Sequence, residues 1–203
     1  MRLMTLASTL LLFSSLTLGC GDDGHSHGDD NEVITTVTLD FAPMGGGTAV
    51  SASFRDDDGD GGNAPTIDPI NLTNGTTYNL SVRFLNELET PAEEITEEVM
   101  DESDQHQIFL TGTAVNGPAT NNPTAPLTHT YTDMDANGLP IGLSNRIVAA
   151  TGTGQLTLTL RHMPPVNDQP VKVAGLADQV KTGGVAAIGG STDVSVTFMA
   201  TVQ

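Results

Sequence analysis

The strongest constraint on the fold is a repeated alternation of apolar residues with Ser and Thr. Residues 155–162 place Leu at every second position, and residues 193–202 alternate Val194, Val196 and Phe198 with polar side chains. Successive side chains of a β-strand point to opposite faces of a sheet, so a period of two predicts strands that bury one face.

Six further segments have a similar β-rich character and are bounded by Gly, Pro, Asn or Asp. They are residues 33–39, 48–54, 78–85, 107–111, 127–131 and 145–150. About eight short strands with no regularly alternating helices favour an all-β fold over an α/β fold. We therefore predict an antiparallel β-sandwich of the immunoglobulin-like kind.

Residues 90–100 break the strand pattern and predict one short acidic helix. Thr90 can act as its N-cap, and Pro91 suits the first helical position. The two glutamates that follow suit the positive end of the helix dipole. Ile95 and Val99 are four residues apart, so they lie on one helical face that can dock on a sheet.

The N-terminus predicts export and lipidation. Arg2 precedes an apolar run that ends at Leu18, and this run is shorter than the about 20 residues of a membrane-spanning helix. Residues 1–19 therefore predict a signal peptide. Gly19 before Cys20 resembles the lipobox of bacterial lipoproteins, which predicts that Cys20 carries the lipid. The alternative is an ordinary signal peptide in which the chain's only Cys falls there by chance.

Residues 20–32 predict a lipidated Cys and a disordered acidic tether, because residues 21–32 include no apolar side chain that could be buried. His25 and His27 stand among aspartates in this tether, where an H-x-H pair can weakly capture zinc, copper or nickel. The alternative is a polar spacer. Residues 33–203 then form the single folded domain.

The acidic charge excludes some partners. The chain has 7 Lys and Arg against 25 Asp and Glu, a net charge of −18. Nucleic-acid binding needs clustered basic residues, and adhesion to anionic lipid needs a basic surface. The charge instead favours divalent cations or a merely solvated acidic surface.

Two acidic loops have the spacing of the first half of a calcium loop. Their candidate ligands are Asp56, Asp58 and Asp60 in the first loop and Asp133, Asp135 and Asn137 in the second. Alternate carboxylates point inward together, and the following Gly permits a sharp turn. Ile67 and Ser144 stand where an EF-hand needs Glu, so the loops resemble the DxDxDG loops of secreted β-rich proteins. Asp68 is a further candidate ligand, and the alternative is two hairpin turns without metal.

A second candidate site combines carboxylates with histidines. Glu98 and Glu102 share one face of a helix at a spacing of four residues. His106 begins one predicted strand and His162 ends another. If these strands are neighbours, the four residues can form a zinc or copper site. The alternative is a solvated acidic face with two unrelated histidines.

Catalytic motifs are missing from the sequence, which has no G-x-S-x-G, H-E-x-x-H or GxxxxGK[ST] pattern. We therefore expect a protein that is not an enzyme.

Several segments together resemble a group of small exported bacterial lipoproteins without settled function. They are the lipobox with its acidic tail, "EVITTVTL", "RDDDGDGGNAP", "TYNLSVRFLNE", "PAEEITEEVMDESDQHQIF", "YTDMDANGLPIGL", "LTLTLRHMP" and "GGSTDVSVTFMATVQ". Members of this group are often labelled type 1 periplasmic-binding-fold proteins, a label that implies two doubly wound α/β lobes. The resemblance implies that the acidic loops and the His106 segment are features of the group, and it supplies no activity.

The sequence as a whole predicts a lipid-anchored, cation-binding β-sandwich at the outer membrane, facing either the periplasm or the cell surface. Calcium is the favoured ion, with zinc or copper second. Such a protein would assist metal capture or an outer-membrane receptor, and nucleic acid is not expected as a partner. The competing interpretation is a structural or adhesive envelope module without a functional metal.

Overall fold

The computed structural model describes residues 32–59 and 61–203. Several predicted features lie outside the described residues, namely the signal peptide, Cys20, His25, His27 and Asp60. No helix in the described ranges is long and apolar enough to cross a membrane.

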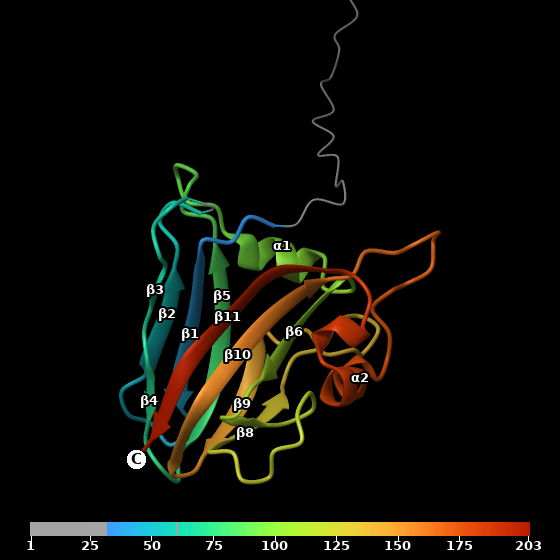
Figure 1. Ribbon diagram of the computed structural model, residues 1–203. Helices are drawn as coiled ribbons and strands as arrows, with labels where there is room; N and C mark the ends of the chain where they lie inside the picture. The colour runs from blue at the N-terminus through green and yellow to red at the C-terminus, as the bar shows by residue number, and fades with distance from the viewer. Residues whose placement is uncertain (1–31, 60) are drawn as a thin grey trace, which may run out of the picture.

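Two β-sheets pack face to face to give a sandwich-like, mostly β arrangement (Figure 1). The larger sheet has the order β3-β2-β1-β5-β9-β8-β7, and the smaller has the order β4-β11-β10-β6. The strands of the larger sheet are β1 (Thr36–Pro43), β2 (Val50–Arg55), β3 (Thr66–Ile67), β5 (Thr77–Leu85), β7 (Val115–Asn116), β8 (Leu127–Tyr131) and β9 (Ser144–Ala149). Those of the smaller sheet are β4 (Ile70–Leu72), β6 (His106–Thr111), β10 (Gly152–His162) and β11 (Ser191–Val202).

The predicted all-β character is confirmed, and each of the eight predicted strands has a counterpart. The described part of the chain adds β3, β4 and β7, each only two or three residues long. Two pairings are parallel, β4 with β11 and β7 with β8, whereas the others are antiparallel.

The main core lies between the sheets, where the alternating residues of both meet. On β5, Leu80 and Phe84 are fully buried, and Leu158 of β10 and Phe198 of β11 are fully buried in the same cluster. Burying one such side chain contributes about 1.5–3 kcal/mol. The period of two therefore fixes which face of each strand is inside.

The predicted helix forms, but it begins later than the sequence indicated. Helix α1 spans Ile95–Asp101, so the prediction that Thr90 caps it and Pro91 opens it is wrong. The backbones of Asn86 and Glu93 exchange hydrogen bonds of 3.1 and 3.0 Å, and this pairing closes residues 87–92 into a loop before the helix. The Thr90–Pro91 peptide bond in that loop is cis.

The docking face of α1 is as predicted, because Ile95 and Val99 are buried in the main core. A second helix, α2 (Leu176–Gly183), was not predicted. Its Leu176 forms a separate small core with Phe109 of β6. A short 3-10 helix, η1 (Val185–Ala187), follows α2. The outer face of the smaller sheet is therefore covered near β6 (Figure 1).

Candidate metal centre

Strands β6 and β10 are antiparallel neighbours, and they place His106 directly opposite His162. The two histidines continue the face of Ile108 and Leu160, which points into the main core. Their rings stack with centroids 4.5 Å apart and planes 6° from parallel. His106 is 0% and His162 is 7% exposed. The adjacency that the predicted histidine site required is therefore confirmed.

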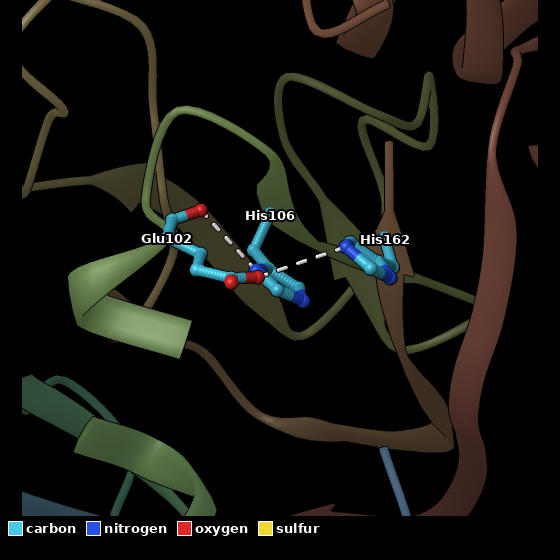
Figure 2. A group of neighbouring side chains, drawn as sticks. All are labelled: Glu102, His106 and His162. Carbon is cyan, nitrogen blue, oxygen red and sulfur yellow. Dashed lines mark hydrogen bonds and ion pairs between the residues drawn. The ribbon is translucent and has the colours of Figure 1, made fainter. Parts of the chain in front are cut away.

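Glu102 joins the two histidines from the connection between α1 and β6. Its Oε2 lies 3.7 Å from Nε2 of His162, and its backbone carbonyl lies 3.2 Å from Nδ1 of His106 (Figure 2). One ligand atom from each of the three residues lies within 4.8 Å of the other two. Ligands placed about 2 Å from a tetrahedral zinc ion are roughly 3.3 Å apart. A ring nitrogen binds in the plane of its imidazole, so the stacked rings would have to turn toward each other, as well as close in, to bind one ion.

Glu98 was predicted with these residues but does not join them. Among the described residues, Glu102, His106 and His162 form the only cluster of three or more His, Cys, Asp or Glu with convergent ligand atoms. The Glu98 carboxyl instead forms a hydrogen bond with Glu32, at the N-terminal end of the described chain. Glu98 therefore borders the centre without being placed as a ligand.

Asp193 of β11 belongs to this neighbourhood, and sequence reasoning missed it. Leu160 pairs with Val194 and Arg161 pairs with Thr192, so Asp193 is the extra residue of a β-bulge. A bulge re-aims a side chain locally. The Asp193 side chain is 0% exposed, and its Oδ2 lies 3.7 Å from Nε2 of His106.

The buried polar atoms around His106 are only partly satisfied. In the described part of the chain, no hydrogen bond reaches Nε2 of His106, and the Asp193 carboxylate takes a backbone hydrogen bond from Glu32. Burial raises the pKa of Asp193 to about 7, although the backbone N–H of Glu32 and the charge of Arg161 oppose that rise. Burial and the neighbouring His162 lower the pKa of His106 to about 4. The fold therefore brings together groups that are costly to bury without a cation.

These pKa shifts predict how the stability of the metal-free protein depends on pH. Burial, with Glu98 as the next cause, raises the pKa of Glu32 to about 7, as burial does for Asp193. A carboxyl whose pKa is higher in the folded than in the unfolded protein stabilises the fold when it is protonated. This stabilisation is complete below the unfolded-state pKa, about 4, and is lost as the pH rises to the folded-state pKa, about 7. The lowered pKa of His106 has the opposite effect, because the folded state favours its neutral form. The resulting stabilisation is complete above about pH 6.5 and is lost as the pH falls toward about pH 4.

Burial also lowers the pKa of His129, which acts in the same direction as that of His106. Two carboxyls and two histidines therefore oppose each other between about pH 5 and pH 7.5, and a comparison of the parent with Asp193→Asn in chelator isolates the contribution of Asp193. The lowered pKa values of Asp68, Glu94 and Asp135 act below this window, because those groups are then ionised in both states. Thermal melts should show the melting temperature of the parent falling relative to that of Asp193→Asn as the pH rises. A constant difference between the two melting temperatures across this range would contradict the prediction.

The first acidic loop lies between β2 and β3 and uses its carboxylates within the protein. Oδ2 of Asp58 accepts hydrogen bonds from the backbone and the side chain of Asn63, at 3.3 and 2.6 Å. Asp68 accepts two bonds from Ser53, at 3.0 and 2.7 Å. One buried oxygen of Asp56 has no hydrogen-bond partner among the described residues. Because Asp60 is not described, calcium binding here stays a prediction.

In the second acidic loop, the protein's own donors surround the two aspartates. Asp133 accepts hydrogen bonds from the backbone of Gly142 and Ser144, both at 2.8 Å. Oδ1 of Asp135 accepts the backbone N–H of Asn137 at 2.8 Å, and its Oδ2 lies 2.8 Å from Nζ of Lys172. The side chains of this ion pair are both 0% exposed. The geometry supports the turn interpretation of this loop, with an ammonium group supplying the positive charge.

The centre is thus assembled by the α1–β6 connection and by strands β6 and β10, which supply Glu102, His106 and His162 respectively. Asp193 of β11 contacts His106 beside it. Two imidazoles with a carboxylate form a donor set that suits zinc or copper(II), whereas calcium takes six to eight oxygen ligands. Comparisons of the chain with protein-family models, with curated proteins and with solved structures found no match.

Proposed function

We propose that this protein is a lipid-anchored envelope protein that captures zinc or copper(II) at the centre formed by Glu102, His106 and His162. The observation that carries the proposal is the opposed, buried histidine pair with a carboxylate converging on it. Imidazole nitrogen is a preferred ligand of both metals. The ion would be held at the α1 end of the sandwich, inside the protein and away from the solvated acidic surface.

The energetics of the metal-free centre support a metal over a purely structural role. A buried polar atom without a hydrogen-bond partner costs about 1–3 kcal/mol. Among the described residues, Nε2 of His106 is in that state and lies 3.7 Å from the Asp193 carboxylate. Apolar residues would fill the same space without this cost, and a bound cation would remove it.

The remaining parts of the proposal come from the sequence. The predicted signal peptide and the predicted lipidation of Cys20 support a location at the outer membrane, facing the periplasm or the surface, where the protein would hand metal to a receptor. Two further predictions also come from the sequence alone. They are calcium binding at the first acidic loop and an immunoglobulin-like class for the sandwich.

The test is a thermal melt of residues 20–203 carrying Cys20→Ser, with His25→Ser and His27→Ser to remove tether binding. The protein is melted in chelator and then with excess zinc, copper(II) or calcium. A ligand at a hundredfold excess over its Kd stabilises the folded state by about 2.7 kcal/mol. For a domain of this size, that corresponds to a rise of roughly 5–10 °C in Tm.

We expect this rise with zinc or copper(II) and a much smaller one with calcium. A rise with calcium alone would move the binding function to the acidic loops and contradict the proposal. If no ion raises the Tm, the structural or adhesive interpretation replaces it.

A further inference from the structure

We propose that Lys172 is a positioning residue of the metal centre, because it ties the turn that carries Glu102 to the second acidic loop. This inference rests on the proposed function, since it concerns the same ion and the same three ligands. It gives the Lys172–Asp135 ion pair a role in metal binding, although neither residue is a ligand.

Glu102 is the ligand whose position the sheets do not fix. His106 and His162 lie opposite each other on paired strands, whereas Glu102 lies just past the end of α1 (Figure 2). Its side chain is 23% exposed, while those of the two histidines are 0% and 9% exposed. The place of the Glu102 carboxylate therefore depends on the backbone turn formed by residues 102–105.

Lys172 holds this turn at the residue next to Glu102. The Gln105 N–H donates to the Glu102 carbonyl at 2.8 Å, and the Gln105 carbonyl accepts the N–H of Met163 at 2.7 Å. These backbone bonds close the turn and fix its far end. Nζ of Lys172 donates to the Ser103 carbonyl at 2.7 Å, so it fixes the near end from outside the turn.

The Lys172 ammonium is itself held in place by Asp135. Nζ lies 2.8 Å from Oδ2 of Asp135, and both side chains are 0% exposed. Because both groups are buried, solvent screens this charge-assisted contact little. Oδ1 of Asp135 accepts the backbone N–H groups of Asn137 and Leu139 at 2.8 and 2.9 Å. The carboxylate is therefore a fixed point of the second acidic loop.

The second acidic loop is in turn fixed to the strand that carries His106. The N–H of Ile108 on β6 donates to the Ile141 carbonyl at 2.7 Å, and the Tyr131 hydroxyl donates to the Ile108 carbonyl at 2.8 Å. Ile108 is two residues from His106 on the same strand. The loop thus has a set position relative to His106, and Lys172 carries that position over to the turn.

Positioning and direct charge effects predict opposite results when Lys172 is lost. A buried ammonium repels a nearby metal cation, so its charge alone weakens binding, and removing it would raise the zinc affinity. A contact that orients a ligand strengthens binding, and losing such a contact commonly costs about tenfold to a hundredfold in affinity. The sign of the change therefore separates the two effects.

The test removes both members of the ion pair, which leaves the net charge unchanged. The parent is residues 20–203 with Cys20→Ser, His25→Ser and His27→Ser, and zinc affinity is measured by competition with a chromophoric chelator. We expect the paired variant, Lys172→Met with Asp135→Leu, to bind zinc about tenfold to a hundredfold more weakly than the parent.

The same pair is then removed in a Glu102→Gln background. If the pair acts through Glu102, its removal there should change zinc affinity by less than about twofold, because the ligand that it positions is already lost. The matched control, Lys181→Met with Asp178→Leu, removes an ion pair on the surface of α2 and should keep the parent affinity.

Urea denaturation shows that each variant is folded before affinities are compared. If the paired variant is unfolded, Lys172→Gln with Asp135→Asn replaces it. Gln is one bond shorter than Lys and does not reach the Ser103 carbonyl, so this variant should show the same loss of affinity.

Two results would overturn the inference and leave the proposed function standing. One is a paired variant that binds zinc as tightly as the parent or more tightly. The other is an equal loss of affinity with and without Glu102→Gln, which would show that the pair acts on the whole fold. A parent protein that does not bind zinc removes both the inference and the proposed zinc centre.

Discussion

Replacing His162 by Gln is expected to weaken zinc binding by about a hundredfold to a thousandfold, and His106→Gln should do the same. Structural zinc sites have apparent binding free energies of about 10–16 kcal/mol. In a four-coordinate zinc site one protein ligand therefore contributes roughly 3–4 kcal/mol, and each 1.4 kcal/mol is a factor of ten in Kd. Competition with a chromophoric chelator measures the affinity, in the protein that lacks the tether histidines.

The matched control for these variants is His129→Gln on β8. His129 is also buried, at 2% exposed, and its Nε2 lies 2.8 Å from the side chain of Asn145 on β9, the neighbouring strand of the larger sheet. We expect this control to lose stability and to keep parent zinc affinity. Parent affinity in both His106→Gln and His162→Gln would show that zinc, if it binds, is held elsewhere in the protein.

Replacing Lys172 by Met should lower the free energy of unfolding by about 3–5 kcal/mol, because it leaves a buried carboxylate without its counter-charge. Nζ of Lys172 lies 2.8 Å from Asp135 and donates to the Ser103 carbonyl at 2.7 Å. Burial lowers the pKa of Lys172, which the Asp135 contact partly offsets. Burial alone would raise the pKa of Asp135, but the bond and charge of Lys172 together with the backbone N–H groups of Leu139 and Asn137 outweigh it and lower that pKa. Urea denaturation in chelator measures the change.

Two variants make the Lys172 prediction specific. Lys181→Met breaks a pair with Asp178, whose side chain is 81% exposed, and should cost less than about 1 kcal/mol. The double variant Lys172→Met with Asp135→Leu removes both charges, and it should recover most of the loss. A single variant no less stable than Lys181→Met would show that the ion pair contributes little.

The strands were predictable because burial on one face imposes a period of two over many residues. Strands β3, β4 and β7 were not, since two or three residues carry no measurable period. Helix α2 had a weak signal, as Leu176 and Val180 are four residues apart. The small core that α2 forms depends on Phe109 of β6. No local sequence pattern reveals that Phe109 packs against this helix.

The two histidines of the centre were predictable as strand ends, but their pairing was not, because alternation says nothing about which strands are neighbours. Asp193 was hidden by the bulge: counting alternation from Val194 places it on the opposite face. The second acidic loop shows the converse problem. The spacing of Asp133 and Asp135 is that of a metal loop, yet a cation from residue 172, distant in sequence, meets Asp135.

The pairing of β6 with β10 also sets when the centre can form. Its donors are spread from residue 102 to residue 162, so they meet only after this long-range pairing is complete. If that step follows the folding transition state, bound metal would slow unfolding and leave the folding rate unchanged. The lifetime of the folded protein would then lengthen.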